Sequence, residues 1–511
     1  MEAILNWLLR AIFVLLGVGA GAWVLQWLRS SWRNAEERWL VRVALGMIIL
    51  AGISAAGHVR LLAQRQYIEE GRQSYARYGD PRRTEERRAE VRGWMLDCTG
   101  DPTQALARYG EQDGSVQRAY PLGEAGANFI GGGAGAEDRD YTVERLFAPE
   151  LRQPANLREA GQLHPAGTDV RFTLCSDVTA EAWRLLRASG RPGGVIIQDV
   201  TTGGVVTYAA TGAPGEPPLG IRRYAPPGSV FKLALAALWW ESGLPDQTQI
   251  PCPSQIQVTS RATISNAGGF SLGPVNGPAG MLIPSCNTAA VWMALRMREQ
   301  LGEQAFADAY RSYGFETYSD NPPRDTTGAF WATNSRAWAR RMSPAPSRVR
   351  ISEATGPAEW AQIAIGQGPV DVTLVGVSRF LQAIGNGGTM LSPTIEWEIA
   401  ARPEGGRQIM STATAQRLQA AMLQTVQSGT ARSVAPAMAR VDWSLGGKTG
   451  TAQLAGARDD GWFAGLMHDA SGRPRYSVVV YLQGGGPGGG QPAAIAAELT
   501  RRMAIRGAEA D

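Results

Sequence analysis

Two long apolar runs open the 511-residue chain, over residues 4–27 and 40–57. Each is about as long as a helix that crosses the hydrocarbon core of a membrane, and the first has no small-residue cleavage site. The segment between them holds three arginines and two glutamates, which by the positive-inside rule predicts a cytoplasmic loop with both flanks outside. We therefore expect residues 1–58 to form an uncleaved membrane anchor of two helices. The alternative is one spanning helix and a second helix that lies in the interface.

Residues 59–180 are more polar than the runs before them. Up to residue 92 the segment is charged, and its apolar residues are too sparse for a core. From residue 93 short strand-like runs alternate with glycine-rich turns, as in FIGGGAGAEDRD at 129–140. This pattern predicts a juxtamembrane helical stalk followed by a small linker domain.

Residues 181–511 show the pattern of a compact α/β domain. Apolar, β-branched runs at 193–200 and 204–210 are separated by a turn and predict a β-hairpin. A helix is predicted over 492–506, directly after three further strand-like runs at 444–455, 461–467 and 476–483. Two early strands and three late strands predict one antiparallel sheet that both ends of the domain build, with helices on both faces.

Composition narrows the possible functions. Apolar residues make up 44% of the chain, which excludes wholesale disorder, and a net charge of +4 is too small to indicate nucleic-acid binding. The four cysteines lack the CxxC spacing of a zinc ribbon, so no metal is predicted.

The chain contains only two lysines, Lys232 and Lys448, and its other 48 basic residues are arginines. A guanidinium is effectively never deprotonated, whereas an amine can titrate and move a proton. The two positions are therefore predicted to need an amine that releases its proton. A Ser-His-Asp relay would have to use one of the chain's three histidines, which leaves few candidates for such a site.

Each lysine lies in a short motif whose residue types suit catalysis or substrate binding. Ser229 precedes Lys232 by three residues at the start of a predicted helix, so the amine can reach the hydroxyl and take its proton. Lys448 lies on a predicted strand with Thr449 and Thr451, and a cation with hydroxyls suits a carboxylate. Between the two threonines, Gly450 lets a substrate backbone lie close to the strand.

A serine and an asparagine that relay protons and hold a substrate amide are expected between these two motifs. Ser285 and Asn287 follow an apolar segment and open a predicted helix, and we favour them. The alternative is Ser319-Asp320-Asn321, which lies in a polar, proline-containing loop and consists of residues typical of a turn.

The segments SVFK, SCN and KTGT, in this order and with these gaps, resemble the transpeptidase domain of penicillin-binding proteins. RGWMLDCTG at 92–100 is similar to the family's juxtamembrane segment, with DCTG where Asp-Arg-Asn-Gly is usual. The resemblance covers residues 92–505 and points to the class B, monofunctional kind, since a glycosyltransferase domain has no room before residue 180. It implies the serine β-lactamase-like fold, with a five-stranded antiparallel sheet flanked by helices, a small N-terminal linker domain and a membrane anchor.

The resemblance also implies a role for each motif. Ser229 would be the acylated nucleophile and Lys232 its general base. Ser285 and Asn287 would pass the proton to the leaving D-alanine and bind the donor stem, and Lys448 would set the electrostatics.

The strand motif would bind the end of the substrate. Thr449 and Thr451, with Gly450 between them, would hold the terminal carboxylate. The backbone N–H groups of Ser229 and Thr451 would form the oxyanion hole.

The activity implied is that of a D,D-transpeptidase that cross-links peptidoglycan stem peptides through a serine acyl-enzyme, binds β-lactams and needs no cofactor. It would be anchored in the cytoplasmic membrane with its catalytic domain on the periplasmic, extracytoplasmic side, beside a polytopic glycosyltransferase partner. Two other functions stay open. One is a D,D-carboxypeptidase or β-lactamase on the same fold, which passes the acyl group to water. The other is a non-enzymatic penicillin sensor or division scaffold.

An exported domain permits disulfides among the four cysteines. Cys98 and Cys175 end two short apolar runs that the resemblance suggests are paired strands, so a Cys98–Cys175 disulfide is one pairing it allows. Cys252 lies between two prolines and is expected as a free thiol. Cys286, inside the SCN motif, is expected to be buried and unpaired.

Overall fold

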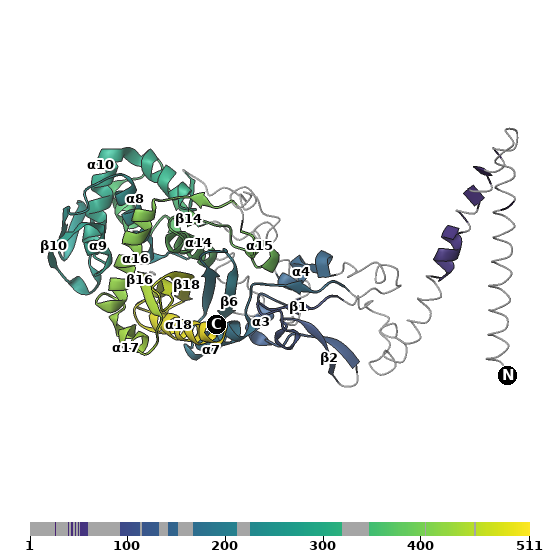
Figure 1. The fold of residues 1–511 in the computed structure, drawn as a ribbon. Coiled ribbons are helices and arrows are strands. Elements are labelled where there is room, and N and C mark those ends of the chain that lie inside the picture. Colours follow the sequence, from purple (N-terminus) through teal and green to yellow (C-terminus); the bar gives the residue numbers. More distant parts are fainter. Residues whose placement is uncertain are drawn as a thin grey trace. The chain divides into compact units, whose positions relative to one another are not determined.

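The structure is a computed structural model (Figure 1). It forms two compact units, residues 1–89 with 111–116 and 161–163, and the rest of the chain. The residues it describes are 26, 39, 42–43, 46–47, 50, 52–59, 92–112, 115–131, 142–151, 167–211, 225–318, 347–403, 405–453 and 456–510.

Most of the predicted membrane anchor, and all of the predicted stalk except its two end residues, lie outside the described residues. Among the residues that are described, no helix combines the length and the apolar composition needed to cross a membrane. The described positions between 39 and 59 are helical. Large apolar side chains are exposed there: Trp39, Val43, Met47, Leu50, Ile53 and Val59.

The second unit is built on a five-stranded antiparallel sheet in the order β16-β17-β18-β5-β6 (Figure 1). The early hairpin supplies β5 and β6, and the late part of the chain supplies the other three strands, as predicted. The strands are β5 (Gly193–Asp199), β6 (Val205–Thr211), β16 (Ser444–Ala452), β17 (Asp460–His468) and β18 (Pro474–Leu482).

Helices cover both faces of this sheet, which explains why its strands are continuous apolar runs. Val195 and Ile197 pack into one core cluster with α7 (Ser176–Ala188) and α18 (Gln491–Ala510), whereas Ile196 packs into the other. Because successive side chains of a strand point to opposite faces, an alternating polar pattern cannot form where both faces are buried.

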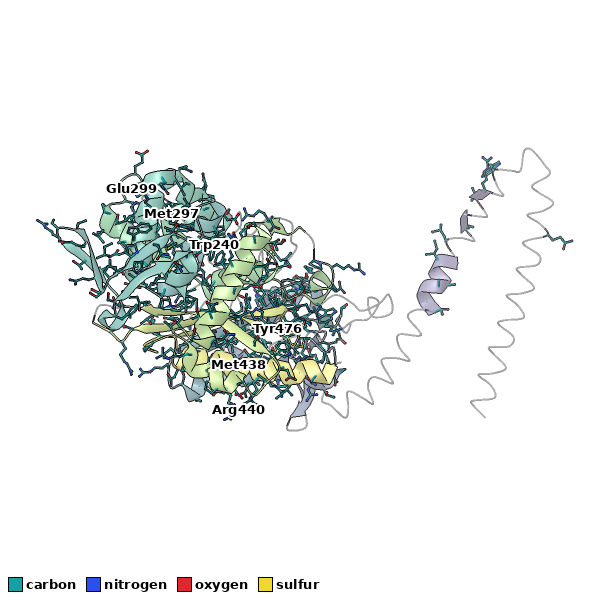
Figure 2. All side chains as sticks on the ribbon, turned by 60° about the vertical axis from the view of Figure 1, so that its left-hand side comes forward. Trp240, Met297, Glu299, Met438, Arg440 and Tyr476 are labelled. Carbon is teal, nitrogen blue, oxygen red and sulfur yellow. A yellow bond between two sulfur atoms is a disulfide. The ribbon has the colours of Figure 1, made fainter. Side chains whose placement is uncertain are left out.

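The opposite face is covered by α14 (Leu374–Gly385), which packs on β5 and β18. Beyond it, α8 (Lys232–Glu241) packs against α9 (Gly277–Leu282), α10 (Asn287–Ser312) and α16 (Thr412–Gln427). Two large side chains, Trp240 of α8 and Met297 of α10, belong to this core (Figure 2).

Shorter elements complete the unit. The 3-10 turns are η2 (Pro102–Gln104), η4 (Gly228–Phe231), η5 (Ala267–Gly269) and η6 (Arg432–Val434). The short helices are α3 (Glu124–Ala127), α4 (Val143–Leu146), α5 (Ala148–Leu151), α13 (Pro357–Ala364), α15 (Trp397–Ala400) and α17 (Ala435–Met438). The short strands are β1 (Met95–Leu96), β2 (Arg108–Gln112), β3 (Ser115–Ala119), β4 (Val170–Arg171), β7 (Gln249–Cys252), β8 (Gln255–Thr259), β9 (Ala262–Ser265), β10 (Leu272–Asn276), β11 (Glu316–Tyr318), β12 (Arg348–Arg350), β13 (Val370–Asp371), β14 (Thr389–Met390) and β15 (Arg407–Gln408).

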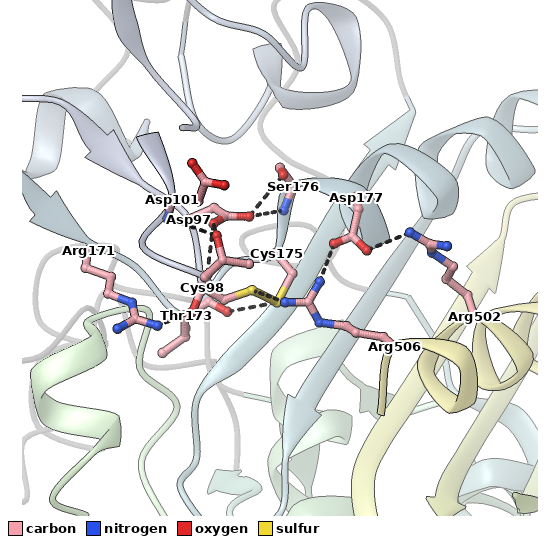
Figure 3. Close-up of polar contacts among 11 residues, drawn as sticks. Asp97, Cys98, Asp101, Arg171, Thr173, Cys175, Ser176, Asp177, Arg502 and Arg506 are labelled. Carbon is pink, nitrogen blue, oxygen red and sulfur yellow. Dashed lines mark hydrogen bonds and ion pairs between the residues drawn. A yellow bond between two sulfur atoms is a disulfide. The ribbon is translucent and has the colours of Figure 1, made fainter. Parts of the chain in front are cut away.

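The segment that carries DCTG is joined to α7, one of the helices that cover the five-stranded sheet. β1 pairs with β4, and a disulfide links Cys98 to Cys175, the residue before α7 (Figure 3). Nη2 of Arg506, on α18, donates a 2.8 Å hydrogen bond to Sγ of Cys98, and its Nη1 pairs with Asp177. The Cys98–Cys175 pairing is thus confirmed, and Arg506 connects the disulfide to Asp177 on α7.

A buried ion-pair group lies in the same part of the chain. The carboxylate of Glu144, 2% exposed, accepts hydrogen bonds from Nη1 of Arg92 at 2.8 Å and from Nη2 of Arg118 at 3.0 Å. Each of its two oxygens is paired with a different guanidinium, so the buried charge is compensated.

Candidate functional site

Ser229 lies in a turn that is pressed against the outer strand of the sheet. Gly228 has a φ of 54°, and a Cβ added to it would lie 2.5 Å from the carbonyl oxygen of Thr451, so only glycine fits. Ser229 belongs to η4 rather than to the first turn of an α-helix as predicted, because the preceding Pro-Pro-Gly segment sets a tight entry. The serine is half-buried, and within the described ranges no hydrogen bond joins its hydroxyl to another group. The hydroxyl is thus available to a base.

Lys232 is the first residue of α8, and its side chain is fully buried. Its Nζ donates hydrogen bonds of 2.8 Å to the carbonyl oxygen of Ser285 and 2.7 Å to Oδ1 of Asn287. Nζ also lies 3.4 Å from Oγ of Ser285, so these three contacts of the amine are all with the segment from Ser285 to Asn287. Burial, and to a smaller extent the charge of Lys448, lower the pKa of Lys232 well below its usual value. The arrangement suits a base.

Ser285 turns the chain between α9 and α10. Its φ of 61° is the only positive φ of a non-glycine residue in the described part of the chain. The left-handed conformation costs such a residue roughly 1 kcal/mol. It presents the carbonyl of Ser285 to one lysine and its hydroxyl to the other, and strain of this kind clusters at functional sites.

Lys448 approaches Ser285 from the strand side. Its buried Nζ donates hydrogen bonds of 2.8 Å to Oγ of Ser285 and 3.0 Å to the carbonyl oxygen of Thr449. Burial lowers the pKa of Lys448 to about 7. Among the described residues neither Lys448 nor Lys232 has an ion-pair partner, so both amines keep their low proton affinity.

The motif KTGT lies on β16, one of the two edge strands of the sheet. A Cβ added to Gly450 would lie 2.5 Å from the carbonyl oxygen of Pro227, so this glycine admits the turn that carries Ser229. Oγ1 of Thr449 lies 2.6 Å from Oγ1 of Thr430, and Thr451 is half-buried. An outer strand has unpaired backbone groups on one edge, which can bind an extended peptide.

The structure therefore brings together Lys232, Ser285, Asn287 and Lys448 through direct hydrogen bonds, with η4 and the KTGT strand in contact beside them. The alternative motif at 319–321 lies outside the described residues.

One prediction about the cysteines is wrong. Cys252 is not a free thiol and Cys286 is not unpaired, because the two form a disulfide between the end of β7 and the residue before α10. The local sequence around each cysteine does not reveal the pairing, because the pairing depends on how β7 packs against α10. The even number of cysteines was the one available signal.

Sequence reasoning also missed Asn266. Its buried side chain accepts hydrogen bonds from the backbone N–H groups of Asn287 at 2.8 Å and Thr288 at 3.1 Å. A lone asparagine in this part of the sequence carries no sign of such a long-range contact.

The comparisons with known proteins concern the family and the fold. The family model described as "Penicillin binding protein transpeptidase domain" matches residues 193–502. The crystal structure of PBPA from Mycobacterium tuberculosis is similar at 20% identity and a TM-score of 0.63, over 81% of this chain and 99% of that one.

Two further solved structures show the same likeness. Pseudomonas aeruginosa PBP2 matches at 19% identity and a TM-score of 0.62, over 80% of this chain and 94% of that one. The D,D-transpeptidase domain of a peptidoglycan glycosyltransferase from Eggerthella lenta matches at 21% identity and a TM-score of 0.58, over 80% and 97%. No curated protein matches the chain by sequence. At these identities the solved structures establish the fold.

Proposed function

The chain belongs to the penicillin-binding protein transpeptidase family, and we propose that it is a D,D-transpeptidase that cross-links peptidoglycan stem peptides through an acyl-enzyme on Ser229. The observation that carries this proposal is the convergence of two buried amines, Lys232 and Lys448, on Ser285. Structures of the similar M. tuberculosis PBPA are acyl-enzyme complexes with imipenem and penicillin G, which supports a covalent intermediate here.

Acylation begins with proton transfer. The neutral amine of Lys232 takes the proton of the Ser229 hydroxyl, and Oγ attacks the carbonyl carbon between the two terminal D-alanines. The backbone N–H groups of Ser229 and Thr451 stabilise the oxyanion. When the intermediate collapses, the peptide bond breaks and the proton passes from Lys232 through the Ser285 hydroxyl to the leaving nitrogen of D-alanine.

Transfer to the second stem peptide reverses this path. Its amine attacks the Ser229 ester, gives one proton back through Lys232, and forms the new peptide bond as Oγ of Ser229 leaves. Lys448, Thr449 and Thr451 hold the terminal carboxylate of the donor while its backbone lies along β16, and Asn287 binds the stem amide.

Covalent labelling tests the nucleophile. A fluorescent penicillin followed by peptide mass spectrometry should place the adduct on Ser229, and Ser229→Ala should abolish labelling while the thermal unfolding transition is retained. Labelling of Ser229→Ala at the wild-type level would refute the assignment.

Product analysis tests the reaction. With glycan strands that carry pentapeptide stems, the wild-type protein should form cross-linked dimers and release D-alanine. Release of D-alanine without dimers would identify a carboxypeptidase, and rapid hydrolysis of penicillin would identify a β-lactamase.

The proposed location is the cytoplasmic membrane, with residues 1–58 as anchor, the catalytic domain outside and a polytopic glycosyltransferase as partner. The two apolar runs and the two disulfides support it, because disulfides persist in oxidising compartments. A reporter that is active only outside the cytoplasm should be active when fused to the N-terminus. An inactive reporter, with an active catalytic domain outside, would leave a single spanning helix.

A further inference from the structure

Asn266 lies directly after β9 and is almost completely buried. Its Nδ2 donates hydrogen bonds of 2.8 Å to the carbonyl oxygen of Pro253 and 2.9 Å to that of Phe270. Its Oδ1 accepts from the N–H groups of Asn287 and Thr288. The amide is therefore held firmly on one side and holds the first two residues of α10 on the other.

These contacts reach Lys232 through a single residue. The backbone N–H of Asn287 donates a hydrogen bond to Oδ1 of Asn266. Nδ2 of Asn287 donates a 2.9 Å hydrogen bond to the carbonyl oxygen of Ser265, the neighbour of Asn266. With both groups held, Oδ1 of Asn287 is directed at Nζ of Lys232 at 2.7 Å.

The residue between Ser285 and Asn287 is tied to the same segment. Cys286 forms a disulfide with Cys252, which precedes Pro253. The segment from Cys252 to Asn266 thus contacts the motif by a covalent bond and by hydrogen bonds, while the strained Ser285 lies just outside these contacts.

We propose that Asn266 is a positioning residue for Lys232. By holding the N-terminus of α10, it places Oδ1 of Asn287 and the carbonyl oxygen of Ser285 around the amine. The proposal rests on the proposed role of Lys232 as the base of an acylation reaction.

A positioning role and a simple helix cap differ in what they change. Loss of a cap lowers stability and leaves the proton affinity of Lys232 as it was. Loss of positioning withdraws two acceptors that favour the ammonium form, so the pKa of Lys232 should fall. Lys448 is the one charged group that acts on this amine among the described residues, so no carboxylate nearby can cause such a shift.

The two lysines make the measurement direct. Isotope-labelled lysine incorporated into the full chain gives two side-chain signals, and Lys448→Met identifies which belongs to Lys232. In Asn266→Ala the titration midpoint of Lys232 should fall by about half a pKa unit or more, and the rate constant of acylation by penicillin should fall about tenfold. Asn266→Asp keeps the acceptor for both N–H groups but loses both donors to the carbonyl oxygens of Pro253 and Phe270, so it should recover only part of the rate.

Thr373→Ala is the matched control. Thr373 is a buried N-cap whose side chain accepts a hydrogen bond from the N–H of Gly376 in α14, a helix that carries none of the site residues. This variant should lower the unfolding temperature and leave the Lys232 midpoint unchanged.

An Asn266→Ala protein whose Lys232 midpoint is unchanged or higher would overturn the proposal, whatever its stability. If Asn266→Ala does not fold, Asn266→Ser, which loses both amide donors and keeps one acceptor, is measured in the same way with the same criterion. The titration of Lys232 does not depend on acylation. A failure of the Asn266 proposal can therefore be told apart from a failure of the proposed nucleophile, which would appear as labelling of Ser229→Ala.

Discussion

Nζ of Lys448 and Oγ of Ser285 are joined by a 2.8 Å hydrogen bond across 163 residues of sequence. The carbonyl oxygen of the same serine accepts a hydrogen bond from Lys232. One residue in a left-handed conformation therefore connects both lysines of the chain, and its hydroxyl is placed to carry a proton away from Lys232.

Arginine should not replace Lys232. Because a guanidinium stays protonated, Lys232→Arg should slow acylation by penicillin about a thousandfold, as much as Lys232→Ala. Lys448→Arg should be milder, about tenfold, since a fixed charge still serves the substrate carboxylate. The measurement is the second-order rate constant of labelling for the three variants. A Lys232→Arg protein that acylates near the wild-type rate would exclude a titrating base.

Stability should rise with pH above neutrality. The pKa of Lys448 is about 7 in the folded protein, against about 10.4 in an unfolded chain, so between these values the unfolded chain binds more protons. The free energy of unfolding should therefore increase from pH 7 to pH 10. Below pH 7 the destabilisation caused by burying the Lys448 amine is fully present. Denaturant unfolding of the wild type and of Lys448→Met checks this: the variant should be more stable at pH 7, and its advantage should shrink toward pH 10. An advantage that stays constant with pH would contradict the low pKa.

The buried carboxylate of Glu144 should matter far more than an exposed one. Glu144→Gln leaves Arg92 and Arg118 without their buried counter-charge and should cost about 3 kcal/mol of unfolding free energy. The matched control is Glu303→Gln, because the pair between Glu303 and Arg298 is more exposed and should be worth less than about 1 kcal/mol. If denaturant unfolding shows the same loss of unfolding free energy in both variants, burial does not set the strength of the ion pair.

All four cysteines should be protected from alkylation in the unreduced protein. Peptide mapping without reductant should recover the Cys98–Cys175 and Cys252–Cys286 pairs. Removing the first pair by a double substitution to alanine should cost roughly 4 kcal/mol in the chain-entropy model, since it opens a loop with a sequence separation of 77. Recovery of alkylated Cys98 or Cys252 from unreduced protein would contradict the pairing.

The sequence by itself determined the central sheet and the main chemical groups. Continuous apolar runs specify the hairpin of β5 and β6 and the three late strands, because strands covered on both faces need no polar positions. The near-absence of lysine, together with the spacing from Ser229 to Lys232, singled out the amines before any contact was known.

The tertiary structure decided what these groups are able to do. The pKa of Lys448 falls because the assembled fold buries it without a carboxylate, and burial is a property of the packed chain. The Cys252–Cys286 disulfide, the conformation of Ser285 and the contacts of Asn266 join segments distant in sequence. Local patterns report the period of a helix or strand, whereas these contacts depend on which elements meet once the sheet and helices have assembled.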